Sequence, residues 1–133
     1  VFKRLSVFIS DFLGELQIWN KCVSGIWCQL NNVNLAHDHF TDMEGVYIIW
    51  HGSDNPENII KVGQGNIAER LYSHRNDPEI QGYNYKTLYV TWAKLMPIYH
   101  DGVEAYLGLV LKPLIAERFP STDLIKVNLP WLL

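Results

Sequence analysis

The sequence lacks any uninterrupted apolar run of the roughly 18 residues that a membrane span needs. A secretory signal is not indicated either, because the opening residues, VFKR, lead into an amphipathic pattern rather than a solid apolar block. We therefore expect a cytoplasmic protein with no membrane partner. The first residue is not Met, so a fragment with a missing partner domain stays open.

Cysteine is scarce and does not follow a metal-binding pattern. Five residues separate Cys22 from Cys28, which is not a CxxC spacing, and no later Cys or His pair completes a zinc set. We interpret the two cysteines as buried or unreactive thiols in a reducing cytoplasm. The histidines that lack a ligand spacing, and that we interpret as structural, are His37, His39, His51 and His100.

An excess of positive charge is also absent. The formal net charge is −3, which argues against a protein that coats nucleic acid by bulk electrostatics. The charge is unevenly distributed, however, because residues 61–100 carry five of the eleven Lys and Arg residues. A length of 133 residues and 48% hydrophobic content fit one globular domain with a substantial core.

The N-terminal part predicts an amphipathic helix followed by a connecting segment. Apolar residues recur at three- and four-residue steps over residues 2–20, which is typical of such a helix. Residues 20–44 read as a loop with a short strand near 26–30. A wide apolar stripe left in water would aggregate, so we expect it to pack on the domain, on a second copy or on a missing domain. The stripe residues expected to be buried are Phe8, Phe12, Leu16 and Trp19.

The rest of the chain predicts three strands and two helices. The β-branched and aromatic segments 45–51, 59–62 and 87–95 read as strands. Asn66 and Glu69 are in capping-box register at the start of a helix that Asp77-Pro78 ends. Asp101 is expected to cap a second helix, with a kinked extension over residues 114–119. We expect an α/β or α+β fold, with a small three-stranded sheet flanked by helices in residues 44–133 and the N-terminal helix and connecting segment in residues 1–43.

Five side chains in this region suggest chemistry on a phosphodiester. Arg70 and His74 are four residues apart and share a helix face, Tyr47 and Lys61 lie on neighbouring strands, and Glu104 lies near the start of the last helix. The set is incomplete for a Ser or Cys triad. An arginine can grip phosphate oxygens, a carboxylate can hold a hard divalent ion, and a tyrosine or lysine can take a proton from water.

In its ordered motifs the chain resembles the GIY-YIG nuclease domain family. The first signature triplet appears as GVY at residues 45–47 and the second as KVG at residues 61–63. The pattern that follows appears as GQGNIAERLYSH at residues 63–74. The late helix appears as EAYL at residues 104–107, followed by LKP at residues 111–113. The resemblance covers about residues 44–115.

The resemblance implies a role for each candidate residue. Tyr47 would activate water, Arg70 would stabilise the scissile phosphate, and His74 would contact the phosphate or assist proton transfer. Glu104 would ligate a single Mg²⁺ or Mn²⁺ ion. Lys61 stands where the family has its second tyrosine, and it would donate to phosphate or act as the base. Gly45 and Gly63 would allow close backbone approach.

Two features of the sequence keep alternatives open. The family places an Asn soon after the Lys-Pro, whereas Asn128, the nearest candidate here, comes late. Glu104, three residues after Asp101, would also fit a capping box. The resemblance implies a metal-dependent endonuclease that hydrolyses nucleic acid, with DNA as the expected substrate. The alternatives are an inactive module that binds nucleic acid or protein, and an interaction domain that uses the N-terminal helix. The aromatic residues Trp50, Tyr89 and Trp92 are interpreted as core rather than as a base-stacking surface.

Overall fold

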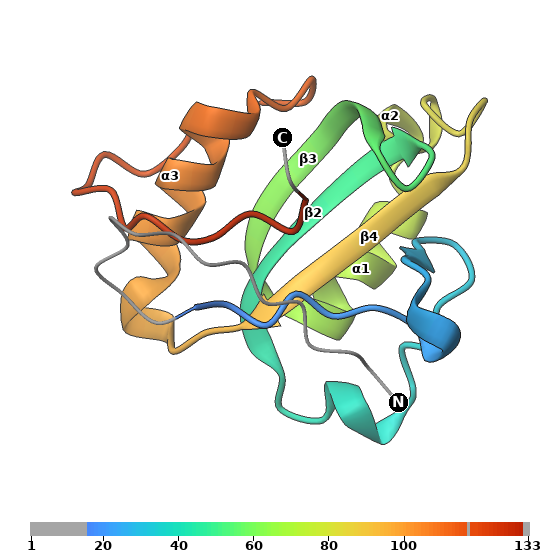
Figure 1. Ribbon diagram of the computed structural model, residues 1–133, viewed down its shortest axis with the longest axis horizontal. Helices are drawn as coiled ribbons and strands as arrows, with labels where there is room; N and C mark the ends of the chain where they lie inside the picture. The colour runs from blue at the N-terminus through green and yellow to red at the C-terminus, as the bar shows by residue number, and fades with distance from the viewer. Residues whose placement is uncertain (1–15, 117, 132–133) are drawn as a thin grey trace.

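A four-stranded antiparallel sheet forms the centre of the computed structural model, which describes residues 16–116 and 118–131 (Figure 1). The strands lie in the order β1-β4-β2-β3, so β1 and β3 form the two edges. The short strand predicted near 26–30 is present as β1, but the predicted three-stranded sheet was short by one, because Cys28 of β1 pairs with Val90 of β4 and so adds this strand to the sheet. The strands are β1 (Cys28–Gln29), β2 (Glu44–Gly52), β3 (Pro56–Asn66) and β4 (Leu88–Lys94).

Helices cover both faces of the sheet, which makes this a small α+β domain. In Figure 1, α1 lies behind the sheet, whereas α3 lies on the other side, next to β3. Among the described residues, no helix is long and apolar enough to cross a bilayer. The α-helices are α1 (Ile67–Arg75), α2 (Pro78–Gln81) and α3 (His100–Leu111), and the 3-10 turns are η1 (Val23–Gly25), η2 (Asp38–Phe40) and η3 (Pro97–Tyr99).

The central strand β2 is apolar on both sides because both of its faces are covered. Tyr47 and Ile49 face the cluster that contains residues of α1, α2 and β4. Val46, Ile48 and Trp50 face the second cluster, which contains residues of α3 and of the C-terminal segment. A strand buried on both faces reads as a continuous apolar run rather than an alternating one, as residues 45–50 do. The interpretation of Trp50 and Trp92 as core is confirmed, since both are fully buried.

The two main helices begin in different ways. Asn66 caps α1 as predicted, with its side-chain oxygen accepting from the Glu69 N–H at 3.1 Å. The prediction for α3 was wrong, because its N-cap is Tyr99 and no side chain caps it, so Asp101 lies inside the first turn. The predicted extension over residues 114–119 is also wrong where the structure describes it, because residues 114–116 and 118–119 are not helical. The left-handed backbone of Lys112 (φ 49°) ends the helix, and the chain after it is irregular.

The predicted N-terminal helix is wrong over residues 16–20, and residues 1–15, including Phe8 and Phe12, lie outside the described residues. The 16–20 segment is not helical because distant partners take its backbone groups. The Gln17 N–H donates to the Asn128 side chain at 2.6 Å, and the Asn20 N–H donates to the Trp92 carbonyl at 3.0 Å. Trp19 is fully buried, as expected for the stripe.

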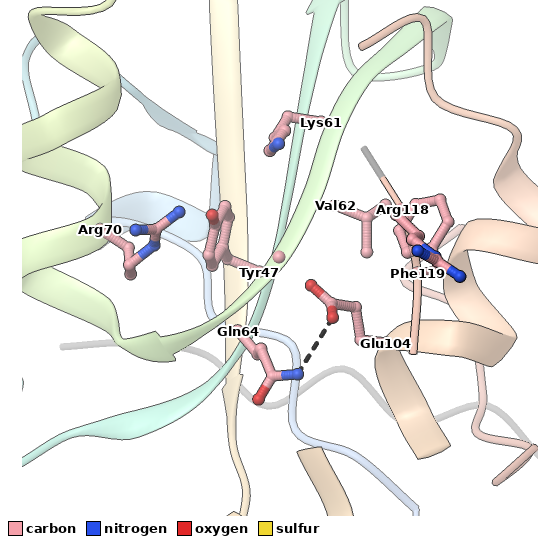
Figure 2. Close-up of a pocket in the computed structure, with 9 residues that line it drawn as sticks. Tyr47, Lys61, Val62, Gln64, Arg70, Glu104, Arg118 and Phe119 are labelled. Atoms are coloured by element: carbon pink, nitrogen blue, oxygen red, sulfur yellow. Dashed lines mark hydrogen bonds between the residues drawn. The ribbon is translucent and has the colours of Figure 1, made fainter. Parts of the chain in front are cut away.

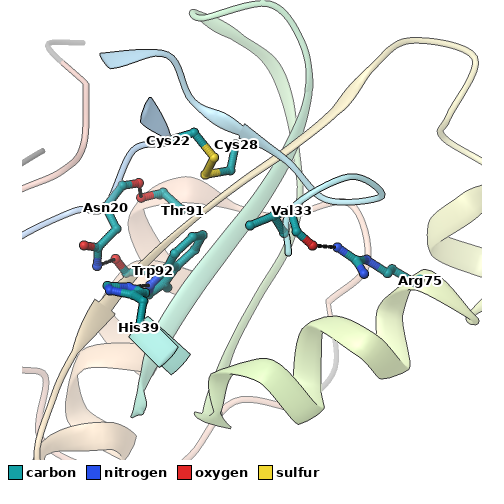
Figure 3. The surroundings of a disulfide bond; sticks show 8 residues. All are labelled: Asn20, Cys22, Cys28, Val33, His39, Arg75, Thr91 and Trp92. Atoms are coloured by element: carbon teal, nitrogen blue, oxygen red, sulfur yellow. Dashed lines mark hydrogen bonds between the residues drawn. A yellow bond between two sulfur atoms is a disulfide. The ribbon is translucent and has the colours of Figure 1, made fainter. Parts of the chain in front are cut away.

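A disulfide joins Cys22 to Cys28, so the interpretation as two free thiols was wrong (Figure 3). The intervening turn folds back on itself, with the Cys22 N–H donating to the Ile26 carbonyl at 2.8 Å. The two Cα atoms are therefore 5.1 Å apart, within the range that a disulfide spans. Neighbouring hydrogen bonds, including Thr91 Oγ1 to the Asn20 carbonyl at 2.8 Å, attach this segment to β4. The cysteines no longer support the expectation of a reducing compartment.

Candidate active site

The register of the β2–β3 hairpin places Tyr47 and Lys61 on the same face of the sheet. Tyr47 pairs with Gly63, and Ile49 pairs with Lys61. Side chains directly opposite each other across two strands share a face, and residues two apart along a strand also do so. The two candidate side chains are therefore diagonal neighbours. Lys61 has only 5% of its surface exposed, although it is a lysine.

Gly63 makes room for the tyrosine. A Cβ atom at residue 63 would lie 2.1 Å from the Tyr47 hydroxyl oxygen and 2.3 Å from the ring carbon that carries it. The Tyr47 ring therefore lies directly over the backbone of its cross-strand partner, where any other residue would displace it. Gly63 is therefore structural, but what approaches its backbone is the Tyr47 side chain, and its effect is to fix the position of a phenol hydroxyl.

His74 contacts that hydroxyl from α1. Its Nε2 is 2.5 Å from the Tyr47 hydroxyl oxygen, which is a short hydrogen bond. His74 is 4% exposed and lies on the buried face of α1, one turn after Arg70. It is not among the residues that line the pocket described below. The structure thus places His74 behind Tyr47, where it contacts the tyrosine oxygen and does not line the pocket.

Glu104 reaches the site from the opposite side of β3. The buried residues Val103 and Leu107 of α3 pack in the second core cluster. This packing holds the helix beside β3, with Glu104 half-buried. The Gln64 amide nitrogen donates to the Glu104 carboxylate at 3.0 Å and to the Asp101 carboxylate at 2.8 Å. Because α3 has no side-chain cap, the capping-box alternative for Glu104 is not supported.

These side chains meet in one pocket of about 140 Å³ at the edge strand β3 (Figure 2). Arg70 and Tyr47 lie on one side of β3, and Glu104 lies on the other with its second carboxylate oxygen directed into the space. A buried water needs only about 10–15 Å³ of such volume, so the pocket can hold a phosphate group or a hydrated ion. The lining residues are Tyr47, Lys61, Val62, Gly63, Gln64, Arg70, Glu104, Arg118 and Phe119.

Burial shifts the protonation of the pocket's carboxylate. The pKa of Glu104 is raised above its usual value, mainly because burial disfavours the charged form, and Asp101 adds to this effect. The hydrogen bond from Gln64 and the positive charges of Lys61 and Arg70 act in the opposite direction, towards a lower pKa. An acidic group held partly buried near cations is typical of functional sites, although structural networks also produce it.

This shift predicts how Glu104→Gln changes stability with pH. The folded state binds the Glu104 proton more tightly than the unfolded state, so the wild type loses stability as pH rises from the usual glutamate pKa to the raised one. Glutamine keeps the size and the acceptor for Gln64 without this loss. We expect the variant to be at least as stable as the wild type at pH 7, with an advantage that shrinks towards pH 4. Urea unfolding at both pH values measures it, and a less stable variant at pH 7 would contradict the prediction.

The residues present fit a hard divalent cation held by one carboxylate. Among residues 16–116 and 118–131, no three His, Cys, Asp or Glu side chains are grouped to hold a metal ion. Mg²⁺ commonly uses one or two carboxylates, several waters and substrate phosphate oxygens instead of an all-protein cage. Glu104 would be the carboxylate, with one oxygen bonded to Gln64 and the other directed into the pocket.

Three polar or aromatic residues of the site were not found from the sequence. Gln64, Arg118 and Phe119 line the pocket, but their sequence neighbourhoods carry no signal beyond the position of Gln64 next to Gly63. Asn128, the late candidate for the family's asparagine, is instead fully buried and bonds the backbone of Gln17 through both ends of its amide. Its role is to join the two terminal segments of the described chain.

Comparisons of the chain with protein-family models, with curated proteins and with solved structures find no match.

Proposed function

We propose that this chain is a metal-dependent endonuclease domain of the GIY-YIG type, which hydrolyses phosphodiester bonds in nucleic acid, with DNA as the expected substrate. The observation that carries the proposal is the convergence on one pocket of Tyr47, Lys61, Arg70 and Glu104, which come from β2, β3, α1 and α3. Their side chains supply a hydroxyl, two cations and one carboxylate, which can serve as the base, the phosphate-binding groups and the metal ligand in phosphodiester hydrolysis.

The cations would bind and orient the phosphate. Arg70 is exposed on α1, whereas Lys61 is buried in the sheet, so a phosphate in the pocket would have one exposed guanidinium and one buried ammonium beside it. Arginine can grip two phosphate oxygens at once, and lysine acts as a point charge. Both would stabilise the negative charge that increases on the phosphate oxygens in the transition state.

The tyrosine and histidine would remove the proton of the attacking water. The short contact between the Tyr47 hydroxyl and His74 Nε2 lets the phenol proton pass to the imidazole while the phenol oxygen takes a proton from water. The water oxygen then forms its bond to phosphorus as the bond to the leaving oxygen breaks, and the leaving oxygen takes up a proton from solvent water. A divalent ion on Glu104, when bound, supplies positive charge at the phosphate.

The test is cleavage of supercoiled plasmid and of branched, single-stranded and RNA oligonucleotides, with Mg²⁺ or Mn²⁺ and with a chelator. We expect nicking that depends on the divalent ion and stops with the chelator. If no nucleic acid is cut under any of these conditions while salt-sensitive binding remains, the chain is a binding module that keeps the site but not the turnover. Absence of both binding and cleavage would contradict both functions.

A further inference from the structure

The chain after α3 returns to the candidate site by a path that hydrogen bonds hold in place. The Leu114 N–H donates to the Ile59 carbonyl and the Ile115 N–H donates to the Ile60 carbonyl, both at 2.9 Å. These bonds attach the segment to the edge of β3 immediately before Lys61. The chain then leaves the strand and passes the mouth of the pocket, where Arg118 and Phe119 become lining residues.

Gly108 fixes the place of Phe119. A Cβ atom at residue 108 would lie 2.7 Å from two carbons of the Phe119 ring, so the ring packs directly on the helix backbone. Gly108 follows Glu104 by four residues and therefore shares its helix face one turn on. The absence of a side chain at residue 108 thus lets Phe119 lie next to Glu104, and the position of Arg118 follows from that of its neighbour.

Arg118 is on the far side of the pocket from Arg70. Figure 2 shows β3 passing between the two, with the Arg118 guanidinium directed away from Tyr47. The Arg118 side chain is exposed, whereas Lys61 is buried in the sheet. Arg118 is therefore placed to meet an anion at its own end of the pocket rather than the group next to Arg70 and Tyr47.

We propose that Arg118 binds the phosphate next to the one that Arg70 and Lys61 hold, so that a nucleic-acid strand crosses the β3 edge between Arg70 and Arg118. The inference rests on the proposed function, since it assumes that the pocket holds a phosphodiester. It adds a second phosphate subsite, and with it the direction in which the strand leaves the pocket. Gly108 and Phe119 are the positioning residues of this subsite.

The experiment measures binding of a 12-nucleotide DNA strand and its RNA counterpart in chelator at several salt concentrations. We expect Arg118→Ala to weaken binding about three- to tenfold and to reduce the slope of log K against log salt by about 0.7, the value for one contact to a single strand. Arg118→Lys should restore part of the affinity and part of the salt slope, because lysine keeps the positive charge but not the paired N–H donors of the guanidinium. The matched control is Lys94→Ala, which removes an exposed charge outside the pocket and should leave the slope unchanged.

Two further arms separate a phosphate subsite from a general charge effect. Gly108→Ala should weaken binding by displacing Phe119. If Gly108 and Arg118 act through the same phosphate contact, the double variant should bind no more weakly than Arg118→Ala alone. With short thymidine ligands followed by NMR shifts, Arg118→Ala should change the affinity of a trinucleoside diphosphate but not of a dinucleoside monophosphate.

The outcomes distinguish this inference from the proposed function. Wild-type binding that Arg118→Ala leaves unchanged in affinity and slope would overturn the inference alone. A reduced slope in a protein that cuts nothing would support the subsite and contradict the nuclease. A wild type without salt-dependent binding to either strand would overturn both.

Discussion

Glu104→Gln is expected to abolish metal-dependent cleavage and to leave the fold intact. Glutamine keeps the length of the side chain and an oxygen that can accept from Gln64, but it loses the charge that holds a hard cation. Arg70→Ala should lower the cleavage rate by a comparable factor, because it removes the positive charge that would stabilise the phosphate in the transition state. Loss of one such preorganised group typically costs on the order of 10²–10³ in rate. Single-turnover nicking of plasmid with saturating Mg²⁺ measures both.

The chain offers a matched control for this result. Asp101 is a second carboxylate bonded to the same Gln64 amide, but it is exposed and does not line the pocket. Asp101→Asn should therefore keep cleavage within about a few-fold of the wild type, well short of the loss expected for a preorganised group. Equal losses of cleavage in Asp101→Asn and Glu104→Gln would show that the reaction depends on the total negative charge near Gln64 rather than on the half-buried Glu104 carboxylate. Full activity of Glu104→Gln would contradict the metal role outright.

Tyr47→Phe is expected to be a worse lesion than Lys61→Met. Phenylalanine keeps the ring over Gly63 and removes only the oxygen that His74 contacts, so the change tests the hydroxyl directly. Loss of a general base typically costs about 10²–10⁴ in rate. Lys61→Met keeps the apolar stem in its buried position and should mainly weaken binding of the phosphate, which raises KM more than it lowers kcat.

The measurement is the single-turnover rate at saturating DNA as a function of pH for the wild type and both variants. With Tyr47 as the base, the rising limb of the pH profile disappears in Tyr47→Phe and survives in Lys61→Met. The opposite pattern, with loss of the limb in Lys61→Met alone, would assign the base to Lys61. The single-turnover rate of a His74→Gln variant should lie between those of Tyr47→Phe and Lys61→Met, since this change removes the proton acceptor behind the tyrosine but keeps the phenol.

Local signals in the sequence predicted those parts of the fold that depend on neighbouring residues. Asn66 and Glu69 form a cap from residues three apart, and the apolar runs of β2 and β4 need only their own composition to read as strands. The same reasoning failed at Asp101, because the 3-10 turn η3 leads directly into α3 and leaves no extended residue at which a side-chain cap could form. It also failed over residues 16–20, where bonds to residues more than 70 positions away decide the conformation.

The candidate site shows the same division. Its motif residues could be named from the sequence, but whether Tyr47 and Lys61 share a face depends on strand register, which pairs residues across the hairpin. Arg118 could not be found at all, because its place depends on the packing of Phe119 against Gly108 and on two backbone bonds to β3. Such contacts join irregular segments, which carry no periodic pattern to read.

The strand order places the disulfide and the candidate pocket at opposite edges of the sheet. The Cys22–Cys28 disulfide lies at the β1 edge, and the pocket lies at the β3 edge, with β4 and β2 between them (Figures 1 and 3). Asn20, just before the segment that the disulfide closes, is attached to the sheet by its hydrogen bonds with Thr91 and Trp92. A thiol reductant would break the disulfide at the β1 edge, whereas substrate would bind at the β3 edge. If the proposed cleavage occurs, we therefore expect the same rate with and without a thiol reductant, because neither cysteine lines the pocket.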